Sequence, residues 1–130
     1  MEGRLTGEVI RLFLRVFDRL GFGFLESVYA NALALELEAA GIPFEREVPI
    51  DVWYKGKRVG QFRLDLLVDA RVVVELKATR LLADPDRRKL LNYLRCSELE
   101  VGLLLHFGPK PSFERMIYTN DRKPDLVPST

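Results

Sequence analysis

The segment Arg63–Lys77 (RLDLLVDARVVVELK) constrains the fold more than any other part of the chain. Two apolar runs flank a polar stretch at 69–71, a pattern that indicates two strands joined as a hairpin. Because alternate residues of a strand share a face, Glu75 and Lys77 must point the same way. Placing Asp65 opposite Glu75 leaves the other face entirely apolar, whereas a slip of one residue would mix charges into it. We therefore expect Asp65 and Glu75 to be direct cross-strand neighbours.

The apolar face of this hairpin predicts a covered sheet. In the expected register, helices cover one set of side chains: Leu64, Leu66, Val68, Val72, Val74 and Leu76.

Helical periodicity comes before the hairpin, and a period of two surrounds it. The expected elements are, in order, helices at 5–20 and 24–40, strands at 44–54, 57–68 and 72–78, a helix at 84–96, a strand at 100–107 and a short edge strand at 114–119. Short turns make the first three strands antiparallel, and the helix at 84–96 then crosses over to the fourth. The order predicts an α/β fold with a mixed sheet.

Helix boundaries and faces follow from local residues. Thr6 and Asp84 are the expected N-caps of the first and third helices, and Gly41 ends the second. The buried stripe expected for the second helix consists of Leu25, Val28, Ala32 and Leu35.

The 130 residues fit one domain, which we expect at 1–120, followed by a loosely ordered tail at 121–130 that contains Pro124 and Pro128. The chain has no apolar run of membrane-spanning length and no signal-peptide pattern, so we expect a cytoplasmic protein. Its single cysteine, Cys96, excludes an internal disulfide and is expected to pack as a small hydrophobe.

On one face of the sheet, the neighbouring carboxylates of Asp65 and Glu75 would repel each other, and a bound divalent cation would remove this repulsion. Carboxylate oxygens suit Mg²⁺ or Mn²⁺ rather than zinc, and Lys77 can orient a water or stabilise charge on a phosphate oxygen. A surface cluster of Glu75, Lys77 and Arg63 on a solvated sheet explains the same pattern without catalysis. The alternation alone leaves both interpretations open.

The formal net charge of +1 gives no global reason for a nucleic-acid partner, so only a local patch can argue for one. Basic residues gather after the third strand and along the crossover helix: Arg80, Arg87, Arg88, Lys89 and Arg95. Phosphate contact and an ordinary solvated helix face both account for them. We expect His106 to be structural and Trp53 and Tyr54 to pack on strands.

Three motifs in this order resemble one family. They are GFLESVY at 23–29, of the form GxxExxY, VELKA at 74–78 and LLNYLR at 90–95. The chain resembles the GxxExxY family of the PD-(D/E)XK nuclease superfamily. This resemblance implies a restriction-endonuclease-like αβββαβ core, with an antiparallel three-strand meander, a crossover helix and flanking helices.

The resemblance also implies roles for individual residues. Asp65 and Glu75 would bind Mg²⁺ or Mn²⁺, Lys77 would be catalytic, and Glu26 would be a further metal or water ligand. A favourable charge in a first helical turn is the other explanation of Glu26. The resemblance further suggests nucleic-acid contact by the crossover helix, including Tyr93. In this chain Lys89 stands where related exonucleases carry glutamine, so either DNA handling has been altered or the site has drifted.

We therefore expect a Mg²⁺-dependent nuclease that hydrolyses DNA phosphodiester bonds and that can form a homodimer. The alternatives are a catalytically weak or inactive nucleic-acid- or partner-binding module with the same fold, and a purely structural domain.

Overall fold

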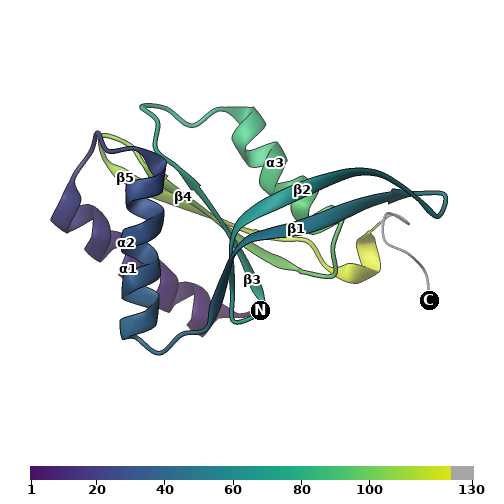
Figure 1. Ribbon diagram of the computed structural model, residues 1–130, viewed down its shortest axis with the longest axis horizontal. Helices are drawn as coiled ribbons and strands as arrows, with labels where there is room; N and C mark the ends of the chain where they lie inside the picture. The colour runs from purple at the N-terminus through teal and green to yellow at the C-terminus, as the bar shows by residue number, and fades with distance from the viewer. Residues whose placement is uncertain (124–130) are drawn as a thin grey trace.

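A five-stranded sheet, in the order β1-β2-β3-β4-β5, separates two helical layers (Figure 1). The computed structural model describes residues 1–123. Helices α1 (Gly3–Leu20) and α2 (Glu26–Ala39) cover one face, and α3 (Asp84–Arg95) covers the other. The strands are β1 (Phe44–Tyr54), β2 (Lys57–Val68), β3 (Val72–Lys77), β4 (Val101–Phe107) and β5 (Pro111–Ile117), followed by a 3-10 turn, η1 (Asn120–Arg122).

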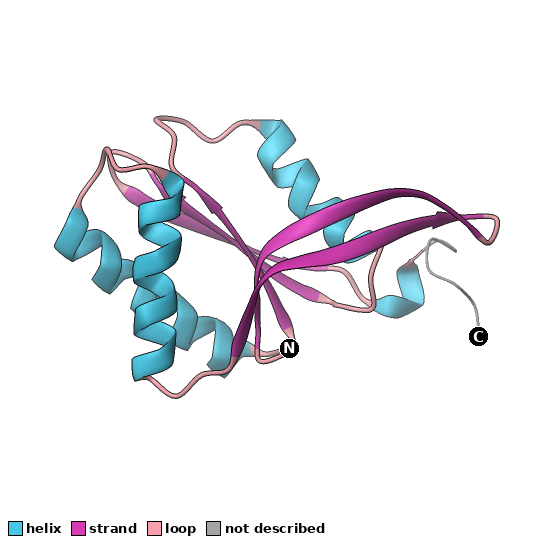
Figure 2. Cartoon of the chain, viewed as in Figure 1, coloured by secondary structure: helices cyan, strands magenta, loops and turns pink. Residues whose placement is uncertain are grey.

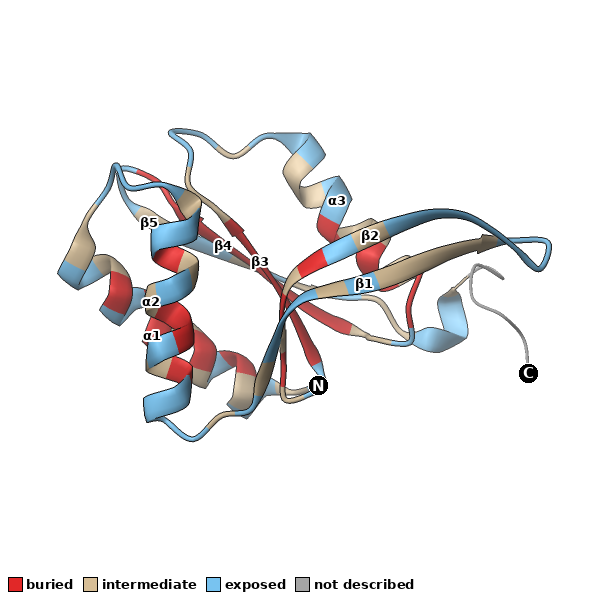
Figure 3. Ribbon diagram, in the orientation of Figure 1, coloured by how far each residue is buried: buried red, intermediate tan, exposed pale blue. Residues whose placement is uncertain are grey.

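The connections confirm the predicted α/β fold with its mixed sheet (Figure 2). Strands β1, β2 and β3 form an antiparallel meander, α3 crosses over to β4, which is parallel to β3, and β5 returns antiparallel. This is the arrangement of a restriction-endonuclease-like core. The most buried segments are β3 and β4, in the middle of the sheet (Figure 3).

The pairing of β2 with β3 follows the predicted register. Leu66 lies opposite Val74, and Leu67 lies opposite Val73. Asp65 and Glu75 are the next step in this register, but the backbone ladder ends before them. The two strands therefore begin to separate where the carboxylates stand.

The predicted core is partly wrong, because Leu64 and Leu66 pack on different faces of the sheet. Leu66 packs with α1 and α2, whereas Leu64 packs in a second cluster under α3. Asp65 lies between these two leucines on β2. The residue opposite Asp65 on β1 is Glu47, because its two neighbours pair with Leu66 and Leu64, and Glu47 has a left-handed backbone with φ 54°. A left-handed residue interrupts the regular pleat. The hairpin thus changes sheet faces at this point.

The buried face of α2 also differs from the prediction. Tyr29, Leu33 and Leu37 are fully buried, whereas Leu25 and Leu35 are 75% and 67% exposed. Apolar residues occur on all sides of this helix, so periodicity does not select the face that packs. The predicted stripe was wrong for this reason.

Two predicted N-caps are also wrong, because each predicted residue lies inside its helix. Helix α1 begins at Gly3, so Thr6 lies inside it and its hydroxyl donates to the Gly3 carbonyl. At α3 the cap position is Ala83, whose N–H donates to the Asp86 carboxylate at 3.0 Å. Acidic side chains in a first helical turn stabilise the unpaired N–H groups there.

Part of the predicted loose tail is held in place. Lys123 donates to the carbonyls of Ser97 and Leu99 at 2.8 and 2.7 Å, where α3 gives way to β4. Residues 124–130 lie outside the described part of the chain. Cys96 is buried as predicted, and burial raises the pKa of its thiol. Within 1–123 no helix is both long enough and apolar enough to cross a membrane.

Candidate active site

The Asp65 carboxylate is held against β3 by a backbone hydrogen bond. Its Oδ2 accepts the N–H of Leu76 at 2.9 Å. Leu76 stands between Glu75 and Lys77, so this bond places Asp65 beside both predicted catalytic neighbours. The side chain replaces the ladder bond that is missing after Leu66 and Val74. A carboxylate bonded in this way has a fixed position.

Glu75 is a buried acid with one unsatisfied oxygen. The side chain is 1% exposed, and Oε2 has no hydrogen-bond partner among the described residues. Burial raises the pKa of Glu75 to about 9, and the hydrogen bond with Asp65 and that residue's charge add to the shift. A buried polar atom without a partner is costly and calls for a ligand or a proton. Glu75 is therefore the most strained electrostatic element of the site.

Lys77 supplies a cation on the same face. It is half-buried, and its Nζ lies 3.8 Å from Oδ1 of Asp86 on α3. Its charge also acts to lower the pKa of both Glu26 and Glu75, against the stronger effect of burial. The ammonium group therefore belongs to the acidic cluster and does not point away into solvent.

The loop between α1 and α2 explains the spacing of the GxxExxY motif. Gly23 has φ 114°, a conformation that favours glycine. The Tyr29 hydroxyl donates to the Gly21 carbonyl and accepts the Phe24 N–H at 3.3 Å. The Tyr29 ring also stacks on Phe107 of β4, with centroids 4.0 Å apart. Gly23 and Tyr29 therefore fix the turn that begins α2.

Glu26 is the first residue of α2 and is half-buried. Burial raises its pKa, and the charge of Asp65 raises it further. A carboxylate that served only as a helix-start charge would be stabilised in its ionised form. The contribution of Asp65 to the shift shows that Glu26 lies within range of the charge on Asp65.

The donor set fits a divalent cation in part. Asp65 lies close enough to Glu75 to raise the pKa of that residue, and the unpartnered buried oxygen of Glu75 is of the kind that binds Mg²⁺ or Mn²⁺. Residues 1–123 contain no group of three or more histidine, cysteine, aspartate or glutamate side chains arranged to hold a metal. Glu26 therefore stands farther out than a direct third ligand in this conformation.

Only some of the predicted nucleic-acid contacts are exposed. Arg80, Arg88 and Lys89 are exposed, and the charge of Lys89 acts on both Glu26 and Glu75. Arg87 instead donates to Glu114 at 2.6 Å. Tyr93 is buried, with 1% of its surface exposed.

Tyr93, on α3, is a buried residue that connects this helix to β2 next to the site. Its hydroxyl donates to the Arg63 carbonyl at 3.1 Å, and Lys89 lies 5.8 Å from its ring centroid. Burial raises the pKa of Tyr93, and the charges of Glu75 and Asp65 raise it further. The phenol is therefore a neutral donor that ties α3 to β2.

Two neighbours of the site, Asp86 and Glu47, are not among the residues that the sequence predicts. Asp86 is the acidic residue in the first turn of α3 that pairs with Lys77. Glu47 has the left-handed backbone opposite Asp65, and its charge contributes to the raised pKa of Tyr93. Asp86 could have been found from the sequence, because an acid near the start of a helix is a capping signal. No sequence pattern marks a strand residue with a left-handed backbone such as Glu47.

His106 has the structural role that its position predicts. The side chain is 6% exposed, and its Nε2 lies 2.6 Å from the Thr79 carbonyl oxygen. This contact holds the chain just after β3, where it turns towards α3. Of the two aromatic residues near the hairpin turn, Trp53 is half-buried and Tyr54 is 57% exposed.

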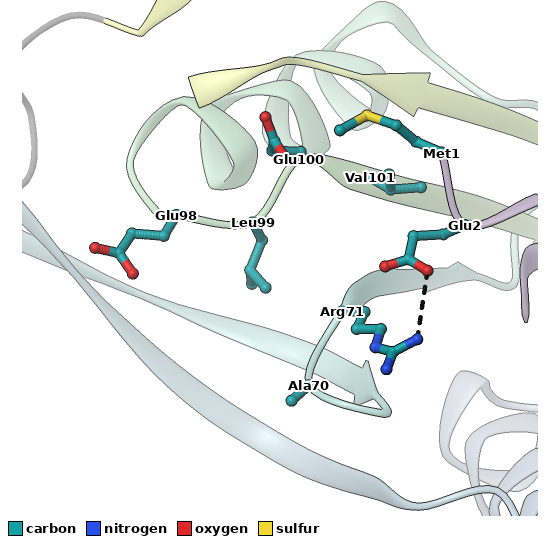
Figure 4. Close-up of a pocket in the computed structure, with 8 residues that line it drawn as sticks. All are labelled: Met1, Glu2, Ala70, Arg71, Glu98, Leu99, Glu100 and Val101. Atoms are coloured by element: carbon teal, nitrogen blue, oxygen red, sulfur yellow. Dashed lines mark ion pairs between the residues drawn. The ribbon is translucent and has the colours of Figure 1, made fainter. Parts of the chain in front are cut away.

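A surface hollow lies at the opposite end of β3 and β4 (Figure 4). Arg71 faces Glu2 across it at 3.7 Å. The other lining residues are Met1, Ala70, Glu98, Leu99, Glu100 and Val101. None of the predicted site residues lines this hollow, so it is separate from the acidic cluster.

Comparisons with known proteins concern the family and the fold of the chain. The chain is similar to the crystal structure of SSO0001, with 17% identity and a TM-score of 0.51 over 72% of this chain. It spans 50% of the length of that structure, and the likeness concerns the fold alone. No curated protein sequence matches the chain. A family model described as the PD-(D/E)XK nuclease superfamily matches residues 3–116. The chain belongs to the PD-(D/E)XK nuclease superfamily.

Proposed function

We propose that this protein is a metal-dependent nuclease that hydrolyses the phosphodiester bonds of DNA. The observation that carries the proposal is the buried, unpartnered Oε2 of Glu75 beside Asp65, with Lys77 on the same face. An acid pair that costs stability in the metal-free fold is expected where function requires it.

Asp65 and Glu75 would hold Mg²⁺ or Mn²⁺. When bound, such a cation lowers the pKa of a water molecule and offsets charge on the phosphate. The Leu76 N–H fixes one oxygen of Asp65, so the rest of that carboxylate remains available. Glu26 would accept a hydrogen bond from a water at the outer side of the pair.

Lys77 would orient the attacking water or stabilise the phosphate oxygen on which charge develops. Asp86, at 3.8 Å, would limit the movement of the ammonium group. Arg80, Arg88 and Lys89 are exposed and would contact DNA phosphates. Arg87 and Tyr93 would position α3 through Glu114 and the Arg63 carbonyl.

The second candidate is a catalytically weak or inactive module that binds nucleic acid or a partner. Two observations favour it: the absence of a three-residue metal group within 1–123, and Lys89 beside the acid pair. A lysine there donates hydrogen bonds and cannot accept them. A possible homodimer and a cytoplasmic location stay predictions from the sequence.

Nicking of supercoiled plasmid DNA separates the two candidates. Wild type is incubated with Mg²⁺, with Mn²⁺ and with chelator, beside Asp65→Asn and a matched control, Asp18→Asn, at an exposed aspartate of α1. The nuclease proposal predicts cleavage with metal that chelator and Asp65→Asn abolish and that Asp18→Asn leaves intact. Metal-independent cleavage, or equal cleavage by Asp65→Asn, contradicts it.

A further inference from the structure

The far end of the β1–β2 hairpin, residues 51–61, extends beyond the helical layers (Figures 1 and 3). We call this segment the arm. At its base, Ile50 and Phe62 pack against the cluster under α3. From Tyr54 to Gln61 every residue of the arm is exposed. A two-stranded ribbon without a hydrophobic partner is marginally stable in water, so burial does not explain the arm's length.

The arm is basic in a nearly neutral chain. It carries Lys55, Lys57 and Arg58 against one acid, Asp51, a net charge of +2 in a chain of +1. Asp51 accepts hydrogen bonds from Gln61 at 2.8 Å and lies 3.5 Å from Arg58. An exposed ion pair of this kind is weak, so the arm still attracts anions.

The backbone of the arm is compact and discourages pairing with another strand. Lys55 and Gly56 have φ values of 50° and 74°, and positive φ at both positions of a two-residue turn keeps the ribbon narrow. A register shift between Val52 and Trp53 interrupts the edge strand β1. Bulges and exposed lysines on an edge strand oppose β-addition by a second protein chain.

The distance from the arm to the acid pair can be spanned by one short stretch of duplex DNA. Lys57 precedes Asp65 by eight residues on the same strand, which is at most about 26 Å at the rise of an extended chain. At about 3.4 Å per base pair, this distance corresponds to roughly eight base pairs of duplex DNA. The major groove of B-DNA is wide enough to admit a two-stranded β-ribbon.

The site supplies one lysine, Lys77, beside three acids, Glu26, Asp65 and Glu75, so most of the affinity for DNA must come from cations elsewhere on the surface. We propose that the arm grips the major groove of duplex DNA about eight base pairs from the phosphate held at the acid pair. This inference rests on the proposed nuclease function, because it assumes that DNA is the substrate.

The test measures binding of a fluorescent duplex of about 24 base pairs by anisotropy, in chelator so that no cleavage occurs. The arm variant is Lys55→Gln/Lys57→Gln/Arg58→Gln. The matched control, Arg11→Gln/Arg15→Gln/Arg19→Gln, removes three exposed charges from α1 in the opposite layer. A charge-conserving variant, Lys55→Arg/Lys57→Arg, checks that the arm itself keeps its shape.

We expect the arm variant to bind the duplex at least about tenfold more weakly at low salt, with a salt slope smaller by about 2 to 3. The α1 control should stay within about threefold of wild type, and the arginine variant should bind like wild type. On a hairpin duplex of about five base pairs, roughly 17 Å long and too short to reach from the site to the arm, the arm variant should lose its disadvantage.

The proposal is overturned if the arm variant binds the long duplex as the α1 control does, or if wild type binds no duplex. It is also overturned if wild type self-associates in sedimentation and the arm variant does so less, with unchanged DNA affinity. Cleavage is scored separately, with Mg²⁺ and saturating DNA. If the arm variant loses DNA binding but wild type does not cleave DNA, the proposed role of the arm is supported and the proposed nuclease function is rejected.

Discussion

The backbone N–H of Leu76 donates to the Asp65 carboxylate at 2.9 Å, in place of the ladder bond that would continue the pairing of β2 with β3. The strands separate at this step, and the side chain of one satisfies the backbone of the other. Asp65 is therefore positioned by the end of a sheet ladder, next to Glu75 and Lys77. Such a fixed carboxylate needs no rearrangement before it binds a cation.

Glu75→Gln should stabilise the metal-free protein, and by more as pH rises. Because the pKa of Glu75 is raised to about 9, the folded state holds its proton more tightly than the unfolded chain. That contribution is fully present below the unfolded pKa of about 4.5 and is lost as pH rises to about 9. The gap in unfolding free energy between Glu75→Gln and wild type should widen by up to about 1.4 kcal/mol per pH unit.

Urea unfolding in chelator at pH 5, 7 and 8.5 measures this gap. Glu45→Gln, an exchange at an exposed glutamate on β1, is the control for the chemical change alone. A Glu75→Gln variant that unfolds more easily than wild type at every pH would show that the acid pair is not under the described strain.

Lys77→Ala should abolish cleavage and leave metal binding largely intact, because Lys77 acts on the water or phosphate and not on the ion. Lys110→Ala, at an exposed lysine before β5, should change neither property. Plasmid nicking and magnesium calorimetry on the same preparations give both readouts. Cleavage at the wild-type rate by Lys77→Ala would remove this lysine from the proposed mechanism.

Tyr29→Phe should destabilise the protein by about 1–3 kcal/mol, because the Gly21 carbonyl and the Phe24 N–H lose their shared partner. Tyr54→Phe, at an exposed tyrosine, should change stability by less than about 0.5 kcal/mol. Thermal unfolding measures both, and hydrogen exchange of the Phe24 amide should accelerate only in Tyr29→Phe. Unchanged exchange would mean that Tyr29 does not hold the start of α2.

Val74→Ala should cost about 1–3 kcal/mol of unfolding free energy, because the side chain is fully buried between β3 and the α1–α2 layer. Val59→Ala, on the arm and 63% exposed, makes the same chemical change outside the core and should be nearly neutral. Denaturant titration of the pair checks the assignment. Equal midpoints for both variants would contradict the described packing.

Local sequence signals predicted the sheet well. The Lys55-Gly56 turn and the alternating runs around it fix both strands of the hairpin, so β1 and β2 begin and end at the expected residues. The register of β2 with β3 followed from the requirement that one face be free of charge. Asp65 and Glu75 could therefore be brought together from sequence alone.

Other features depend on contacts that no local pattern encodes. The left-handed Glu47 turns the hairpin between sheet faces, and Leu64 consequently packs under α3. Helix α2 has apolar side chains in every direction, and the stacking of Tyr29 on Phe107 selects the face that packs. In both cases the local sequence is compatible with more than one buried face, and tertiary contacts determine which face packs.

Calorimetric titration of Mg²⁺ into the metal-free protein at pH 7 and 8.5 tests the central claim most directly. Because binding must displace the proton of Glu75, wild type should bind Mg²⁺ more tightly at pH 8.5 and release up to one proton, seen as a heat that varies with the buffer. Asp65→Asn should lose this binding, and Asp51→Asn should keep it. Absence of binding by wild type at millimolar Mg²⁺, or full binding by Asp65→Asn, would contradict a metal site at Asp65 and Glu75.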